Sequence, residues 1–273
     1  MVGATANHSL FLAVHEISHG LAFKNLHHNR YIGMLANLPI SIAYSVTFKP
    51  YHMEHHRYQG ADGVDTDIPT PLEAWLITGS ATGRVDHACR KAVFMFLNIF
   101  AYALRPMLVK PDLVPKDRKI ALNWAIQLSY DAALFAVGGR GALGYLLLST
   151  FFAGSIHPTA GHFLAEHYVV EGNFETYSYY GWLNIFAYNV GYHNEHHDFP
   201  NVAWSRLPRV REIAPEFYDH LPRCESWPGL IVKYITDDSV GAFSRVKRPD
   251  KPADELASPN GARLACILTG KGD

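Results

Sequence analysis

Three short histidine clusters constrain this chain more than any other feature of its sequence. They read HEISH at 15–19, HMEHH at 52–56 and HNEHH at 193–197, and we call them the histidine boxes. The first box has the spacing HxxxH, and the other two share the spacing HxxHH. Positions i, i+3 and i+4 share one face of a helix, so each box can direct its imidazoles toward one point. A chain with 16 histidines produces close pairs by chance, but chance accounts poorly for a repeated HxxHH beside an HxxxH.

This number of imidazoles indicates a metal site. Neutral imidazole is a good ligand for iron, zinc and copper, and eight ligands are too many for one ion but fit a pair. His167, in a polar stretch after the second predicted membrane helix, is the candidate for a ninth ligand, whereas His162 lies off its helical face. The predicted box ligands are His15, His19, His52, His55, His56, His193, His196 and His197.

The composition indicates a membrane protein with a large aqueous part. Hydrophobic residues make up 48% of the chain and charged residues 18%, below the usual quarter for soluble domains. The mean hydropathy is nevertheless close to zero, so much of the chain must lie in water. Lys and Arg (24) nearly balance Asp and Glu (25), which gives no indication of nucleic-acid binding. We therefore predict an all-α integral membrane protein whose cytosolic helical cap holds a histidine-rich site for two metal ions.

The apolar segments predict how the chain crosses the membrane. Residues 119–137 and 141–157 predict a helical hairpin, which returns the chain to the side of the boxes. Residues 1–14 are too short for a full span and predict the final half of a membrane helix. Residues 31–48 are long enough to cross, but a crossing there would put the first two boxes on opposite sides. We therefore predict a re-entrant or interfacial segment, which Pro39 in mid-run also favours.

Charged and polar residues refine this topology. Residues 93–109 contain Arg105-Pro106 and predict an interfacial helix. Asn123, Gln127 and Asp131 share one face of the outgoing hairpin helix, where they either hydrogen-bond a neighbouring helix or meet the polar part of a lipid substrate. Only Arg140 lies at the hairpin turn, so the positive-inside rule places the boxes in the cytosol. Basic residues gather on the box side: Lys49, Arg57, Arg84, Arg90, Lys91, Lys116, Arg118 and Lys119.

Carboxylates near the boxes are candidates to hydrogen-bond the ligand imidazoles, a usual arrangement in metal sites. Asp62, Asp65 and Asp67 follow the second box in a loop rich in Gly, where ordinary turn chemistry is the alternative role. Four further candidates lie within or beside the boxes: Glu16, Glu54, Glu195 and Asp198.

The boxes allow two chemical interpretations. HEISH also matches the HExxH motif of zinc proteases, with Glu16 as general base, but that site needs one zinc and leaves both HxxHH boxes unexplained. Histidine-bound iron in a membrane instead indicates dioxygen activation beside a lipid chain, since activated oxygen can remove hydrogen from an unactivated C–H bond. The three cysteines, Cys89, Cys224 and Cys266, form no CxxC motif and fit a reducing compartment.

The strings around the boxes are more specific than the boxes themselves. NHSLFLAVHEISH, FKPYHMEHHRYQGADGVDTDIPT and NVGYHNEHHDFPN resemble the sphingolipid Δ4-desaturase (dihydroceramide desaturase) family, within the membrane fatty-acid desaturase superfamily. The resemblance runs from about residue 5 to residue 248, with an interruption at 77–92. It implies a desaturase domain over 1–248, and the polar residues 249–273 predict a disordered tail.

This resemblance implies an oxidoreductase of the endoplasmic-reticulum membrane that converts dihydroceramide to ceramide, with a trans double bond between carbons four and five. It implies two iron ions, O2 as co-substrate, and electrons from NADH through cytochrome b5 and its reductase. His167 matches a position where related acyl desaturases have an additional histidine ligand. Family members also carry a further segment before NHS, so the resemblance implies an incomplete N-terminal hairpin. The alternatives are C4-hydroxylation to phytoceramide at the same site, and a truncated relative without catalytic activity.

Overall fold

The computed structural model describes residues 1–79, 81–114 and 117–248, and within them the chain is helical with only isolated β-bridges. The predicted tail at 249–273 and Cys266 lie outside the described residues. The all-α prediction is confirmed. The α-helices are α1 (Val2–Ser18), α2 (Leu26–Ala36), α3 (Ser45–Tyr58), α4 (Pro71–Ala74), α5 (Arg84–Val109), α6 (Arg118–Ala153), α7 (His162–His167), α8 (His193–Asp198), α9 (Leu207–Ile213), α10 (Pro215–Tyr218) and α11 (Trp227–Thr236). Short helical turns connect them: η1 (Leu38–Ile40), η2 (Trp75–Gly79), η3 (Pro111–Leu113), η4 (Pro158–Gly161), η5 (Trp182–Phe186) and η6 (Trp204–Arg206).

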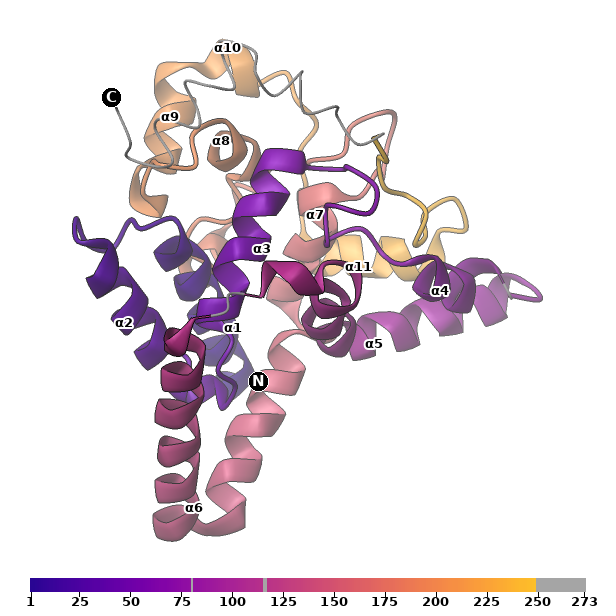
Figure 1. Cartoon of the computed structure of the whole chain (residues 1–273). Helices are drawn as coiled ribbons and strands as arrows, with labels where there is room; N and C mark the ends of the chain where they lie inside the picture. Colours follow the sequence, from indigo (N-terminus) through magenta and orange to yellow (C-terminus); the bar gives the residue numbers. More distant parts are fainter. Residues whose placement is uncertain (80, 115–116, 249–273) are drawn as a thin grey trace.

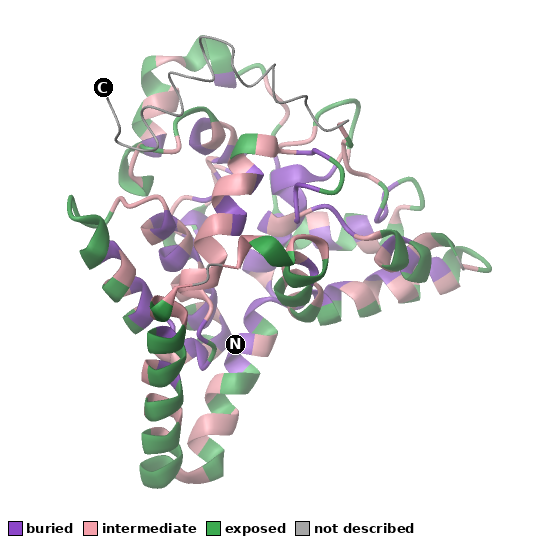
Figure 2. Cartoon of the chain, in the orientation of Figure 1, coloured by how far each residue is buried: buried purple, intermediate pink, exposed green. Residues whose placement is uncertain are grey.

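Helix α6 is the predicted hairpin. Its helical geometry is interrupted at Gly139, with φ 66° and ψ −172°, and its two arms project together from the body of the molecule (Figure 1). Large apolar side chains such as Leu128, Phe135 and Leu148 are exposed along the arms, which Figure 2 shows mainly as exposed and intermediate residues. Such an apolar surface is suited to lipid rather than water. The hairpin is thus the membrane-crossing unit that the apolar pattern predicts.

Helix α5 differs from its prediction. It begins at Arg84, well before residue 93, and its 26 residues are long and apolar enough to cross a membrane. Arg105 does not count against this, because its guanidinium is buried and paired with Glu73 at 2.7 Å. In Figure 1, however, α5 runs across the line of the α6 hairpin instead of along it. An interfacial position for α5 therefore stays a prediction.

The segment from α2 to α3 contains a sharp bend. The chain bends by 111° between the helical stretches Leu26–Ile40 and Ser45–Tyr58, so no single straight helix could cross the membrane here. This bend is what a re-entrant segment requires. It is joined to the hairpin by the polar face of α6: Asn37 Nδ2 donates to Asn123 Oδ1 at 2.8 Å, and Gln127 Nε2 donates to the carbonyl of Leu38 at 3.3 Å. These contacts support the hydrogen-bonding role of the polar stripe and give its members partners inside the protein.

We call the helices α7 to α11 and their connections the cap. Packing in its core holds the first residues of α7 in place. Trp227, at the beginning of α11, is fully buried and stacks on Tyr179 with ring centroids 4.2 Å apart. The backbone of α11 also approaches η4 closely, because a Cβ atom on Gly161 would lie 2.3 Å from the carbonyl oxygen of Trp227. Only glycine permits this approach. The chain then enters α7 directly, which places His167 in the interior.

The hairpin turn gives a direct test of this fold. Gly139→Ala puts a side chain into a backbone conformation open essentially to glycine alone, which costs about 1–3 kcal/mol. We expect the apparent Tm of the purified protein in detergent to fall by several degrees. Gly141→Ala is the matched control, because a Cβ there meets nothing within 4 Å and the backbone has no positive φ. Equal Tm values for the two variants would contradict the assigned turn.

Candidate metal centre

The three boxes, far apart in sequence, converge in the structure. Helices α1, α3 and α8 gather with α7 above the α6 hairpin, where buried residues are concentrated (Figures 1 and 2). Their imidazoles form two groups, each with ligand atoms within 4.8 Å of one another. The five-histidine group consists of His15, His19, His52, His56 and His196, and the three-histidine group consists of His55, His167 and His197.

The five-histidine group has converging ring nitrogens. The Nε2 atom of His52 lies 2.8 Å from Nε2 of His19 and 3.1 Å from Nε2 of His56. His196 Nε2 lies 3.1 Å from His56 Nε2, and the His15 ring adjoins His52 with centroids 4.3 Å apart. A ring proton can serve only one such contact at a time, whereas a cation at the common point receives every lone pair. This donor set fits a metal ion.

The three-histidine group lies beside the five-histidine group. A fourth histidine, His193, is in contact with its members. His167 Nε2 is 2.9 Å from His55 Nε2 and 3.1 Å from His193 Nε2. The rings of His193 and His197 have centroids 4.5 Å apart, so His193 belongs to this group. The His56 and His197 rings stack at 4.3 Å, which makes the two groups neighbours. All nine predicted ligand histidines are therefore brought together.

Helix geometry explains how each HxxHH box divides between the groups. At about 100° per residue, positions i and i+4 differ by roughly 40° and position i+3 lies roughly 60° to the other side. In α3 the i, i+4 pair, His52 and His56, joins the five-histidine group, while His55 turns to the other. In α8 the i, i+4 pair, His193 and His197, joins the three-histidine group, while His196 turns to the five-histidine group. The expectation that each box aims at one point is thus wrong for both HxxHH boxes.

Burial favours the metal-binding form of these imidazoles. Desolvation lowers the pKa of His196 well below its usual range, and the neighbouring His15 and His19 imidazoles lower it further. Burial and neighbouring imidazoles lower the pKa of His167 in the same direction. His196 and His167 are therefore neutral at physiological pH, with a lone pair free for a cation. For His55, burial alone would lower the pKa, but Asp67 and Asp65 raise it to about 9.

The loop after the second box supplies a carboxylate to the three-histidine group. Asp65 accepts a hydrogen bond from His55 Nδ1 at 3.0 Å, and Asp67 Oδ2 lies 3.6 Å from the same nitrogen. Burial alone would raise the pKa of Asp65, but its contacts with His55 lower it to about 2. Asp62 instead pairs with Lys247 at the surface. Asp65 therefore holds His55 with Nε2 directed into the group, as a carboxylate beside a ligand imidazole does.

Sequence reasoning missed a buried carboxylate beside the three-histidine group, Glu166. Its Oε1 lies 3.7 Å from Nδ1 of His193 and 2.6 Å from Nδ1 of His162. Burial raises the pKa of Glu166 well above its usual range, so it and His162 share a hydrogen bond more than an ion pair. His162 itself belongs to neither group. The sequence feature that could have indicated Glu166 is its position directly before His167, a candidate ligand.

The four carboxylates predicted within or beside the boxes do not hydrogen-bond the imidazoles in the part of the chain that the structure describes. Glu16 accepts from the backbone N–H of Trp204, and Asp198 accepts from the hydroxyl of Tyr218. Glu195 is fully buried and accepts from Tyr180 and Ser178. Glu54 is half-buried. Glu16 and Glu195 follow a box histidine by one and two residues, which turns them toward other faces of their helices. Glu16, Glu195 and Asp198 instead connect the helices of the boxes to neighbouring segments of the chain.

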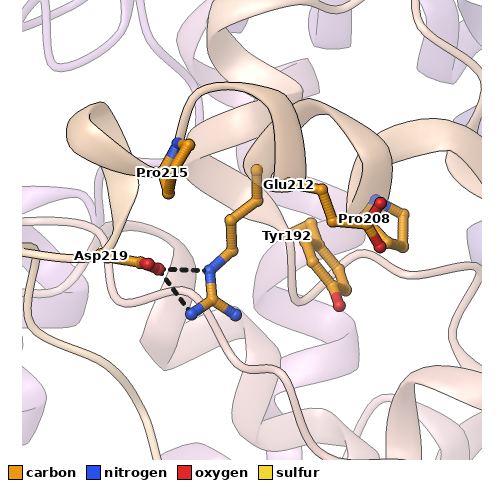
Figure 3. A pocket seen from close by; sticks show the side chains of 6 residues that line it. Tyr192, Pro208, Glu212, Pro215 and Asp219 are labelled. Atoms are coloured by element: carbon orange, nitrogen blue, oxygen red, sulfur yellow. Dashed lines mark hydrogen bonds and ion pairs between the residues drawn. The ribbon is translucent and has the colours of Figure 1, made fainter.

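The cap also carries a surface pocket of about 250 Å³, drawn in Figure 3. Its lining residue Arg211 pairs with Asp219 at 2.6 Å. The Arg211 guanidinium also lies over the Tyr180 ring, 3.9 Å from its centroid, and Tyr180 donates to Glu195. This chain of contacts links the outer surface of the cap to α8. It stabilises the third box.

The role of Asp65 can be tested with a neighbour as control. Asp65→Asn removes the charged acceptor from His55 Nδ1. We expect the affinity of the three-histidine group for a metal ion to fall roughly 10- to 100-fold. The measurement is metal bound per chain after dialysis against graded metal concentrations. Asp62→Asn, in the same loop but on the surface, is expected to bind metal as the wild type does. Equal binding by both variants would exclude a role for Asp65.

Comparisons with known proteins agree with this site. The family model for fatty acid desaturases matches residues 1–227. A sphingolipid delta(4)-desaturase of Schizosaccharomyces pombe is 48% identical over 265 residues, which cover 93% of this chain and 70% of that protein. Similar proteins of Oryza sativa (49% identical, 90% of this chain and 72% of the relative) and Drosophila melanogaster (48%, 90% and 74%) carry the same description. The chain belongs to the fatty acid desaturase family and, within it, to the sphingolipid delta(4)-desaturases.

Proposed function

We propose that this protein is a sphingolipid Δ4-desaturase that converts dihydroceramide to ceramide, using O2 at two histidine-bound iron ions. The observation that carries the proposal is the division of nine buried or half-buried imidazoles into two adjacent groups. A zinc protease needs one ion and three ligands, so it leaves most of this arrangement without a role. Relatives at nearly half identity are named for the Δ4 reaction.

The two histidine groups have defined roles in this proposal. The five-histidine group would hold one iron, and His55, His167, His193 and His197 would hold the other. When bound, iron supplies the dioxygen activation needed to break an unactivated C–H bond, which no side chain can do. The protein contributes the rest: Asp65 orients the His55 imidazole, and burial of the cluster excludes water.

The membrane topology supports the choice of a lipid substrate. The α6 hairpin has an exposed apolar surface, and the helices that carry the imidazoles gather above it (Figure 1). By the positive-inside rule the cap faces the cytosol, where NADH, cytochrome b5 and its reductase would supply electrons. We assign the protein to the endoplasmic-reticulum membrane on the family resemblance, and the free thiols of Cys89 and Cys224 fit the reducing cytosolic side.

Lipid mass spectrometry on cells that lack their own Δ4-desaturase tests the activity. Cells expressing this protein are expected to convert labelled dihydroceramide to ceramide with a trans double bond at carbon four. His196→Ala opens the five-histidine group and should reduce the product at least roughly 100-fold, since an oriented metal ligand is lost. Lys24→Ala, an exposed change away from the boxes, is the control.

The products distinguish the proposal from its alternatives. Phytoceramide in place of ceramide would assign C4-hydroxylation to the same site. Absence of both products from folded, metal-loaded protein would identify a relative without catalytic activity. Either result would contradict desaturation as the function.

A further inference from the structure

A group of three buried histidines lies outside the nine imidazoles of the metal centre. They are His8 on α1, His157 after α6, and His162 at the start of α7, and each is at most 3% exposed. The rings of His8 and His162 meet edge to face with centroids 5.0 Å apart, and His157 stacks on His8 at 5.9 Å. The three residues therefore form a second cluster, which we call the inner histidine cluster.

The hydrogen bonds of the inner histidine cluster are incomplete. His157 is satisfied at both nitrogens, by Thr159 at 2.7 Å and Thr5 at 3.2 Å. His8 Nδ1 lies 2.9 Å from the carbonyl oxygen of Ala153, so this nitrogen carries the proton and Nε2 is left as an acceptor. Nε2 of His8 is buried and has no partner among the described residues. The same is true of His162 Nε2.

Trp227 adds an unsatisfied donor to the same region. Its ring centroid lies 6.1 Å from that of His162, and its buried Nε1–H has no partner in the described part of the chain. The His162 ring thus neighbours both the ring of His8, which has an unsatisfied acceptor, and the ring of Trp227, which has an unsatisfied donor. Buried polar atoms without partners are rare because each one carries a desolvation penalty. A hydroxyl group both donates and accepts, so it matches this arrangement whichever nitrogen of His162 carries the proton.

The cluster lies close to the metal centre. Glu166 connects them, because the same oxygen is 2.6 Å from His162 Nδ1 and 3.7 Å from His193 Nδ1. Along α1, His8 precedes His15 by two turns, roughly 10 Å on one helix face. A dihydroceramide head carries hydroxyls on carbons one and three, within three bonds of carbon four. A hydroxyl bound at the cluster would therefore keep carbons four and five next to the two histidine groups.

We propose that His8, His162 and Trp227 form a hydroxyl-binding subsite, which holds the polar head of the lipid and positions the carbon atoms that react. This inference rests on the proposed function. The three residues are positioning and specificity residues, since they touch the head and not the reacting bond. The competing occupant of the subsite is a structural water molecule.

Deoxy analogues of the substrate test the subsite. Dihydroceramide, its 1-deoxy analogue and its 3-deoxy analogue are compared by kcat/KM with purified, metal-loaded protein. We expect the wild type to prefer dihydroceramide over at least one analogue by roughly tenfold, the effect of one buried hydrogen bond. His8→Phe and Trp227→Phe each remove one polar atom and keep a ring, and they are expected to lose most of that preference while still converting the deoxy analogue. His157→Gln is the control and should keep the preference.

A binding measurement separates this inference from the proposed function. Metal-free protein is heated with each of the three lipids in mixed micelles, and the shift in apparent Tm is recorded. Greater stabilisation by dihydroceramide than by a deoxy analogue, lost in His8→Phe, supports the subsite. Equal stabilisation by all three lipids, or a preference unchanged in both ring variants, overturns it and leaves a structural water. If wild-type protein converts no dihydroceramide, the proposed function fails and these binding results alone decide the subsite.

Discussion

The crowding of imidazole nitrogens is the constraint on which the rest of the structure depends. Nε2 atoms from different helices meet at 2.8–3.1 Å, and neutral imidazoles have too few protons to make every such contact a hydrogen bond. Burial at the same time keeps the rings of α7 and α8 uncharged. Cations at the two points would accept these lone pairs. The surrounding helices are arranged to bring these nitrogens to two points.

The fold achieves this by joining a membrane hairpin to a small helical cap. The polar face of α6 holds the bent α2–α3 segment through Asn123 and Gln127, which places the second box at the base of the cap. The close contact of Gly161 with Trp227 places α7 and therefore His167. Contacts of Glu16, Glu195 and Asp198 then close the cap over the boxes. The site consequently lies where an apolar lipid chain and a polar environment meet (Figures 1 and 2).

Much of the site could be predicted from the sequence, because local spacing carries it. The eight candidate ligands of the boxes, the hairpin turn near Gly139 and the carboxylate of Asp65 follow from patterns within a few residues. His167 was a candidate because of its polar surroundings and the family resemblance. The division of the HxxHH boxes was contained in the same spacing, in the angle between positions i+3 and i+4. Glu166 was missed because its contact with His193 depends on how α7 docks, which no local pattern shows. The suitability of α5 for crossing a membrane was missed because Arg105 is neutralised by Glu73 from α4.

Metal analysis of the purified protein tests the central claim most directly. Elemental analysis, combined with Mössbauer spectroscopy after growth on enriched iron, counts the ions and distinguishes their coordination environments. We expect two iron ions per chain in nitrogen-rich environments. We also expect His196→Ala to disturb the signal of one ion and His197→Ala that of the other. One ion per chain, zinc in place of iron, or identical effects of the two variants would contradict the division into two histidine groups.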